Sequence, residues 1–249
     1  MKNKIYSVLR LILPLFFWIG TWQIASMLIG HKFLLPSVND TAVALFELLF
    51  EVEFYLVTFL SIFRVIIGLI LGSLIGIILA FTSYKVPTIN NILSPLFSVV
   101  KSTPIASIII ILYIMLSGNT LTVFVAVLMV TPIVWQNVLD SFTSIPRDLI
   151  EVCDAYQVSS LVRLRILVLP SVMKYFIPAL ITASGLSWKA SISAEIIAYT
   201  SRSLGQYIND ASNNLDTPTV FACTVVVIIF SIILEKLTKY LLRRCENWL

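Results

Sequence analysis

Long uncharged stretches dominate the chain and predict membrane-spanning helices. Residues 11–30 are twenty uncharged residues, and a helix of that length crosses a hydrocarbon core of ~30 Å. Residues 102–139 carry no charge over 38 residues, which is enough for two helices joined by a turn at 117–120, where the chain reads Ser-Gly-Asn-Thr. Three further apolar stretches, at about 55–83, 175–198 and 217–234, bring the predicted number of spans to six, and the first two of them contain charged residues.

The second predicted span carries small residues at a spacing that favours close helix packing. Gly68, Gly72 and Gly76 repeat every four residues and let another helix approach closely. At the third span, Pro104 predicts a broken or bent start, because proline removes a backbone donor and clashes with the preceding turn.

Composition supports the same interpretation. The 249 residues are 59% hydrophobic and 12% charged, with a mean hydropathy of +0.98. A chain of this kind has too few polar residues to cover its apolar surface in water, so lipid must cover it. We therefore expect an all-α integral membrane protein.

The distribution of basic residues predicts the orientation. With the N-terminus in the cytoplasm, twelve of the 17 lysines and arginines lie on the cytoplasmic side and three lie within spans, which leaves only Lys32 and Arg202 outside. An excess of Lys and Arg marks the cytoplasmic loops of membrane proteins. Both termini and the polar loop at 143–172 are thus predicted to be cytoplasmic. A short helix at about 42–50 is predicted on the outer surface.

Four residues within the spans are candidates for a translocation path: Arg64, Trp188, Lys189 and Glu195. An ionisable side chain inside a span must face protein or water. For Arg64, which lies near its helix start, extension to the outer headgroups is an equal alternative. Lys189 and Glu195 are six residues apart and do not share a helix face. Each therefore faces a cavity, meets a partner on another helix, or belongs to a purely structural buried pair.

The polar loop contains a short amphipathic helix. Leu149, Val152, Cys153 and Tyr156 recur at helical spacing and form one apolar stripe on a helix expected at about 148–158. A helix with an apolar face between membrane spans predicts a docking site for another protein, although an ordinary amphipathic loop would show the same stripe.

The chain lacks the common motifs of enzymes. It has one histidine, no HExxH, GxSxG or GxxxxGK[ST] motif, and three cysteines without metal-ligand spacing. No catalysis, no ATP binding through a phosphate-binding loop and no metal site are expected in this chain.

The loop also resembles a motif of ABC importer permeases. That motif reads E-A-A, three residues, G, nine residues, I-x-L-P. Glu151 takes its first position, Leu167 replaces the isoleucine, and Leu169-Pro170 takes the last two. Val152 and Cys153 replace the alanines.

The glycine of the motif is also replaced. Gln157 stands at that position, where glycine would permit a positive φ. The turn is therefore expected to be altered or shifted toward Ser159-Ser160.

Four more segments resemble the nitrate, sulfonate and taurine branch of these permeases. They are LLPSVND at 34–40, SIFRVIIGLILGSLIG at 61–76, Trp188 with Ala194-Glu195, and SLGQYI at 203–208 followed by Asp216-Thr217. Together with the loop they cover about 200 residues in the expected order.

The resemblance implies a fold and a set of partners. It implies a type I importer permease, with a first helix and external segment at 1–54 and a core of five helices and the coupling loop at 55–249. A second permease subunit, two ATP-binding subunits that bind ATP and Mg, and an extracytoplasmic solute-binding protein would assemble with it in a bacterial plasma membrane, without nucleic acid. The solute would be small and anionic or heterocyclic. An ion-coupled secondary transporter is the alternative.

The resemblance also implies which residues couple to the ATPase. They are Leu149, Glu151, Val152, Cys153, Tyr156, Gln157, Leu167, Leu169 and Pro170.

The predicted topology can be tested by cysteine labelling. A Glu47→Cys variant should react with an impermeant thiol reagent in intact spheroplasts, because residue 47 lies in the predicted outer segment. Labelling that requires permeabilised cells would contradict the orientation.

Overall fold

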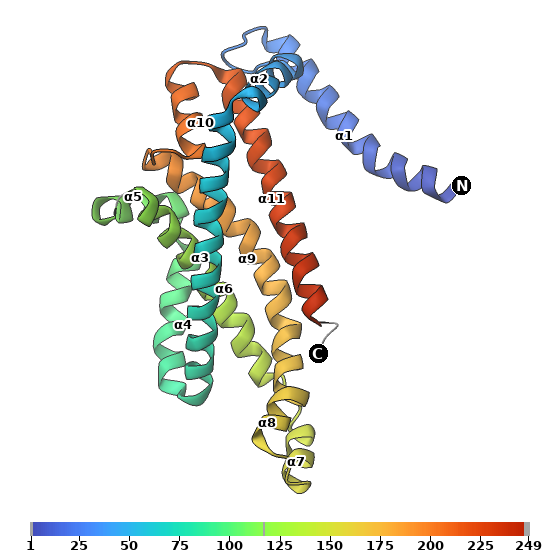
Figure 1. Ribbon diagram of the computed structural model, residues 1–249, viewed down its shortest axis with the longest axis vertical. Helices are drawn as coiled ribbons and strands as arrows, with labels where there is room; N and C mark the ends of the chain where they lie inside the picture. The colour runs from blue at the N-terminus through green and yellow to red at the C-terminus, as the bar shows by residue number, and fades with distance from the viewer. Residues whose placement is uncertain (1, 117, 247–249) are drawn as a thin grey trace.

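The computed structural model describes residues 2–116 and 118–246, which form eleven α-helices and one π-helical turn without a strand (Figure 1). The elements are α1 (Lys2–Ile29), α2 (Val38–Phe50), α3 (Val52–Lys85), α4 (Pro87–Ser102), α5 (Ile105–Met115), α6 (Gly118–Thr143), α7 (Arg147–Ala155), α8 (Ser160–Arg163), η1 (Leu164–Val168), α9 (Leu169–Ile197), α10 (Leu204–Asn213) and α11 (Thr217–Glu246). The all-α prediction is confirmed. Ser117, in the predicted turn, lies outside the described residues.

Four helical segments are long and apolar enough to cross a membrane. Within the described residues they are Val52–Lys85, Gly118–Thr143, Ser160–Ile197 and Thr217–Leu242. The bent pair α4–α5 forms a fifth if it is counted as one span, and α1 contributes the shorter apolar segment Phe16–Ile29. The chain is thus a multi-pass membrane protein, and the count of six spans stays a prediction.

The glycine repeat of α3 lies against α6, as the spacing predicted. A Cβ atom on Gly72 would lie 2.7 Å from the Cβ of Val130, and one on Gly76 would lie 2.9 Å from that of Val134. Gly68 packs in the same way one turn earlier. Because real Cβ atoms do not approach so closely, the two helices can meet along this line only through glycine.

The third span differs from its predicted start. Instead of beginning at Ser102, the helical segment begins at Pro87 directly after α3, breaks near Pro104 and resumes as α5 at an angle of 105°. The bend is therefore confirmed. The hydropathy pattern missed α4 because one side of this helix is polar, and Phe97 secures it by packing on Trp135 of α6.

Short helices cover the two ends of the bundle. At one end lie α2 and α10, and at the other lie α7 and α8 (Figure 1). The expected short helix at 42–50 is present as α2 and begins earlier, where Ser37 forms a capping box with Asp40. Hydrogen bonds from the Ser37 hydroxyl and from Lys32 lower the pKa of Asp40 below its ordinary value.

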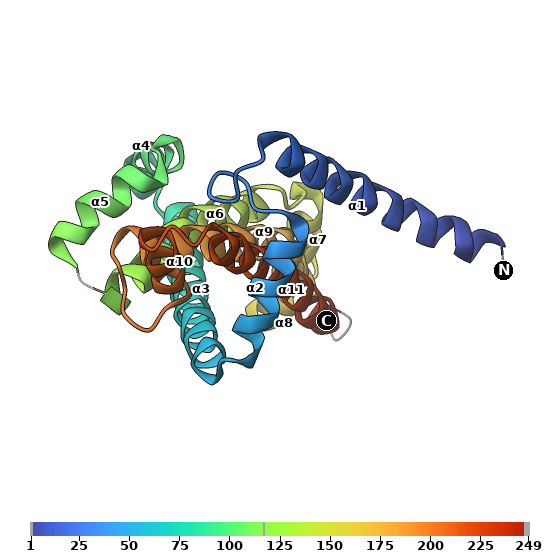
Figure 2. The same ribbon diagram turned by 90° about the horizontal axis from the view of Figure 1, so that it is seen from above.

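Helix α1 extends away from the bundle in both views (Figures 1 and 2). Its last turns are held by Trp22, which donates a hydrogen bond to the Pro36 carbonyl at 3.0 Å and packs on Phe221 of α11. Phe16 and Trp18 are exposed, so lipid or another chain must cover this surface.

We predict that Gly72→Val destabilises the bundle. The added atoms would overlap Val130 and force α3 and α6 apart, which costs on the order of 1–3 kcal/mol. The thermal denaturation midpoint in detergent should fall. Gly20→Val is the matched control, because a Cβ on Gly20 meets no described atom within 4 Å. Equal midpoints for the two variants would contradict the packing argument.

Candidate functional site

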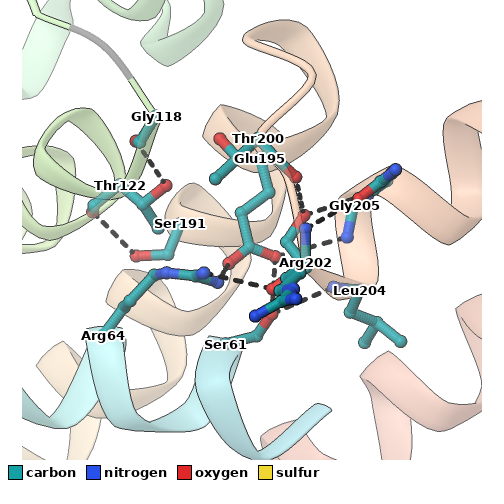
Figure 3. Close-up of polar contacts among 12 residues, drawn as sticks. Ser61, Arg64, Gly118, Thr122, Ser191, Glu195, Thr200, Arg202, Leu204 and Gly205 are labelled. Carbon is teal, nitrogen blue, oxygen red and sulfur yellow. Dashed lines mark hydrogen bonds and ion pairs between the residues drawn. The ribbon is translucent and has the colours of Figure 1, made fainter. Parts of the chain in front are cut away.

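A buried ion pair joins α3 to α9. The Arg64 Nη1 atom lies 3.0 Å from Glu195 Oε1, and the two side chains are 7% and 0% exposed (Figure 3). Removing one partner of such a pair strands a charge in an apolar environment and typically costs 3–5 kcal/mol, roughly. The pair therefore fixes the spacing of these two helices.

The second carboxylate oxygen of Glu195 is also satisfied. Its Oε2 accepts a hydrogen bond from the Ser61 hydroxyl at 2.8 Å and one from the Gly205 backbone N–H at 3.3 Å. The Ser61 hydroxyl in turn accepts from the Leu204 N–H at 3.0 Å. Leu204 and Gly205 are the first two residues of α10, so the carboxylate lies at a helix N-terminus, where the helix dipole favours negative charge.

Gly205 is required by this arrangement. A Cβ at position 205 would overlap the Cβ of Glu195, and its distance to the Glu195 carbonyl carbon would be 2.6 Å. Only glycine lets α10 approach α9 closely enough for its N–H group to reach the carboxylate.

Arg64 also holds the loop between α9 and α10. Its Nη2 atom donates to the Arg202 carbonyl at 3.1 Å. Tyr199 and Arg202 adopt positive φ angles of 48° and 50° in this loop, a backbone conformation that residues other than glycine rarely adopt. The Arg202 N–H donates to Gln206 at 2.7 Å, and this contact helps to keep the strained residue in place.

The structure separates the four path candidates. Arg64 pairs inside the protein and does not extend to the headgroups. Glu195 pairs with Arg64 on another helix, which was one of the expected alternatives, and it does not pair with Lys189. Trp188 is fully buried and donates to the Val227 carbonyl of α11 at 2.9 Å. Lys189 is exposed on α9. That any of the four lines a path stays a prediction.

The predicted amphipathic helix in the polar loop is α7, which ends at Ala155. Leu149, Val152 and Tyr156 of the stripe are 47%, 52% and 80% exposed, whereas Cys153 is buried against the protein. Glu151 is exposed beside them and makes no ion pair among the described residues. Three apolar side chains and one acid thus form an exposed surface on α7, which lies at this end of the bundle (Figure 1).

The turn after α7 lies at Gln157, the position where the permease motif has glycine. Gln157 adopts φ 51°, so the expected shift toward Ser159-Ser160 was wrong. The Gln157 N–H donates to Asp154 at 3.1 Å and the Val158 N–H donates to Cys153 at 2.9 Å. This pattern of two bonds is the Schellman motif, which offsets the cost of a left-handed glutamine.

A continuous helical rod leads from the loop to the ion pair. The segments α8, η1 and α9 run without a break from Ser160 to Ile197, and Arg163 pairs with Asp154 of α7 at 2.8 Å. Leu167 lies in the π-helical turn, and Leu169-Pro170 forms the start of α9 two residues later. The wider turn accommodates a proline that has no N–H to donate.

The geometry defines a class of protein: a multi-pass helical membrane protein with an interlocked ion pair near one end and an exposed short helix at the other. Residues 72–247, more than half of the chain, match the family described as binding-protein-dependent transport system inner membrane component. The chain belongs to this family.

A curated relative agrees with this assignment. The taurine transport system permease protein TauC of Escherichia coli (strain K12) is 26% identical over 163 residues, which cover 65% of this chain and 59% of TauC. The match therefore spans less than two thirds of that relative. The resemblance drawn from the sequence motifs is confirmed at the level of the family.

Sequence reasoning missed the partners of Glu195. The two segments that carried the family resemblance contain Ser61 and Gly205, which donate to Glu195, and Leu204, which donates to Ser61. Nothing in either segment indicates that these residues meet. A recognisable signal was the glycine directly after Ser203-Leu204, because Ser203 is the N-cap of α10 and its hydroxyl accepts from the Gln206 N–H.

We predict that Arg64→Met lowers stability strongly. The change strands the Glu195 carboxylate in the interior, and a loss of about 3–5 kcal/mol is expected. The denaturation midpoint in detergent should fall, and adding Glu195→Leu should recover part of the loss by removing the stranded charge. Lys189→Met, on an exposed face of α9, is the control. An Arg64→Met protein as stable as the wild type would show that the pair contributes little.

Proposed function

We propose that this chain is the transmembrane permease subunit of an ATP-binding-cassette importer. The exposed surface of α7 supports the proposal most directly, because it lies within the family match and offers a separate ATPase a place to dock. The solute would be small and anionic or heterocyclic, and the chain would supply the path while the partner hydrolyses ATP.

The docking surface has the composition of a protein interface. Leu149, Val152 and Tyr156 are apolar and exposed, and their burial would stabilise a complex at about 25 cal/mol per Å² of apolar area. Tyrosine at the centre of an interface is often a hot spot. Glu151, beside the stripe, would pair with a basic group of the ATPase.

The remaining partners follow from the same proposal. Two ATP-binding subunits would hold ATP and Mg, a second copy of this chain would complete the path, and an extracytoplasmic protein would deliver the solute. The exposed apolar surface of α1 supports burial against lipid or a second subunit. The assembly would lie in a bacterial plasma membrane with both termini of this chain in the cytoplasm.

Coupling would travel along the helical rod. A displacement of α7 would pull on α8 through Asp154 and Arg163, and α8 continues into α9 through η1. Since α9 carries Glu195 near its other end, the movement would reach the ion pair with α3 as a rigid-body shift. Leu167, Leu169 and Pro170 lie at the junction, where a π-helical turn can absorb a change of angle.

The path would follow α9. Lys189 is an exposed charge in the second half of this helix and would face the solute, whereas Arg64, Trp188 and Glu195 would shape the wall from behind. A charged side chain within a span that faces lipid would be costly, which supports a watery environment for Lys189.

We predict that a Glu151→Lys, Tyr156→Asp variant loses the ATPase. The changes reverse the charge and place a carboxylate on the apolar surface of α7, while both side chains are exposed and the fold should be retained. Co-purification with the ATP-binding subunit and solute-stimulated ATP hydrolysis are the measurements.

Phe50→Asp is the matched control for this experiment. Phe50 is an exposed aromatic residue at the opposite end of the bundle, and its replacement should leave the complex intact. A double variant that still holds the ATPase and still transports would contradict the role of α7, and it would favour the ion-coupled secondary transporter instead.

A further inference from the structure

A groove lies between α9 and α11 in the half of the bundle that carries α7. It has a volume of about 410 Å³, and its lining includes Lys174, Ile177, Pro178, Ile181 and Thr182 of α9 and Lys239 of α11. Figure 1 shows the two helices running beside one another toward this end. We refer to this surface as the lysine groove.

The two lysines lie at the same depth along the bundle. At a rise of ~1.5 Å per residue, Lys174 lies about 34 Å along α9 from its end at Ile197. By the same measure, Lys239 lies about 33 Å along α11 from its start at Thr217. Both distances slightly exceed the ~30 Å thickness of a hydrocarbon core. The two ammonium groups therefore lie at the level of the lipid headgroups.

The deeper part of the groove is apolar. Ile177, Pro178 and Ile181 line it on the side toward the middle of the membrane. The Thr182 hydroxyl donates to the Pro178 carbonyl at 3.1 Å, so its hydrogen is already bonded within α9. Cations at the headgroup level with an apolar wall below them follow the order of polarity along a phospholipid molecule.

The positive charge of the groove has no neighbouring acid to neutralise it. Lys174 and Lys239 are exposed, and neither forms an ion pair among the described residues. Glu235 lies one turn before Lys239, but its carboxylate lies against Gly185 of α9, deeper in the bundle. Two cations and no carboxylate thus line the groove. Lysine is a common partner of phosphate groups.

We propose that the lysine groove binds an anionic phospholipid from the leaflet on the α7 side. The phosphate would lie between Lys174 and Lys239, and an acyl chain would cover Ile177 and Ile181. A soluble anion would suit the two lysines, but it would leave the apolar wall without a partner. Each lysine at a membrane surface strengthens the binding of anionic lipid by about fivefold. The proposal requires only that the chain lies in a membrane, so it goes beyond the permease function.

Lipid retention by the full-length chain tests the proposal. The chain is purified in detergent with equal amounts of dioleoyl phosphatidylglycerol and dioleoyl phosphatidylcholine, and native mass spectrometry counts the lipids that stay bound. The wild type should retain phosphatidylglycerol in excess. Lys174→Gln and Lys239→Gln should each reduce this excess by about fivefold. Both side chains are exposed and unpaired among the described residues, so the fold should be retained.

Lys236→Gln is the matched control. Lys236 is exposed on α11 three residues before Lys239, but it is not among the residues that line the groove. Its replacement should leave the excess of phosphatidylglycerol unchanged. Equal retention of the two lipids by the wild type, or an equal effect of Lys236→Gln and Lys239→Gln, would overturn the proposal, because a general basic surface would then explain the binding.

Competition by a soluble phosphate distinguishes a lipid from a free anion. Glycerol 1-phosphate carries the phosphate group without an acyl chain, so at millimolar concentration it should leave the bound phosphatidylglycerol in place. Displacement of the lipid would assign the groove to a soluble anion and overturn the proposal. The measurement uses neither ATP nor transport, and its failure would therefore leave the permease function standing.

Discussion

A carboxylate buried in an apolar helix bundle must be neutralised and fully hydrogen-bonded, and the arrangement around Glu195 follows from this constraint. In a medium without water, an unpaired charge or an unsatisfied donor costs several kcal/mol. Glu195 pairs with Arg64 of α3 and accepts hydrogen bonds from the Ser61 hydroxyl, also on α3, and from the Gly205 N–H of α10. None of these partners lies on its own helix, so satisfying one side chain determines how three elements meet. The absence of a side chain at Gly205 is part of the same solution.

Helix α9 connects the two ends of the molecule to the buried ion pair. Helix α9 receives the loop with α7 at one end and carries Glu195 near the other, and its neighbour α6 packs closely on α3 along the glycine repeat. Bundles with such close contacts move as rigid bodies, because small changes cannot be absorbed by loose packing. On the coupling role proposed for α7, a displacement of this helix would be transmitted along α9 to the ion pair, and the π-helical turn at Leu164–Val168 is where the rod could bend.

Features that depend on local periodicity were predictable from the sequence, and features that depend on distant pairing were not. Some features depend only on residues that lie within a few helical turns of one another. They are the apolar stretches, the spacing of Gly68 to Gly76, the bend at Pro104 and the stripe on α7. Helix α4 was missed because the polar residues on one of its sides are typical of a loop. Its other side is buried where Phe97 packs on α6. Gln157 was misjudged because the energy that holds it at positive φ comes from two backbone hydrogen bonds rather than from its own side chain. The pairing of Arg64 with Glu195 joins residues 131 positions apart, and only the topology brings them together.

The ion pair also decides where charge is left over. Glu195 can neutralise one arginine, and its position between α3 and α10 makes that arginine Arg64. The carbonyl that Arg64 contacts belongs to Arg202, and both arginines line one cavity of about 410 Å³ beside the ion pair. A loop held at positive φ by Gln206 and Arg64 keeps Arg202 in place at the cavity wall. The positive character of the cavity is therefore a direct consequence of how the buried carboxylate is satisfied, and a change that weakens the pair should alter both the stability of the bundle and the charge at this cavity.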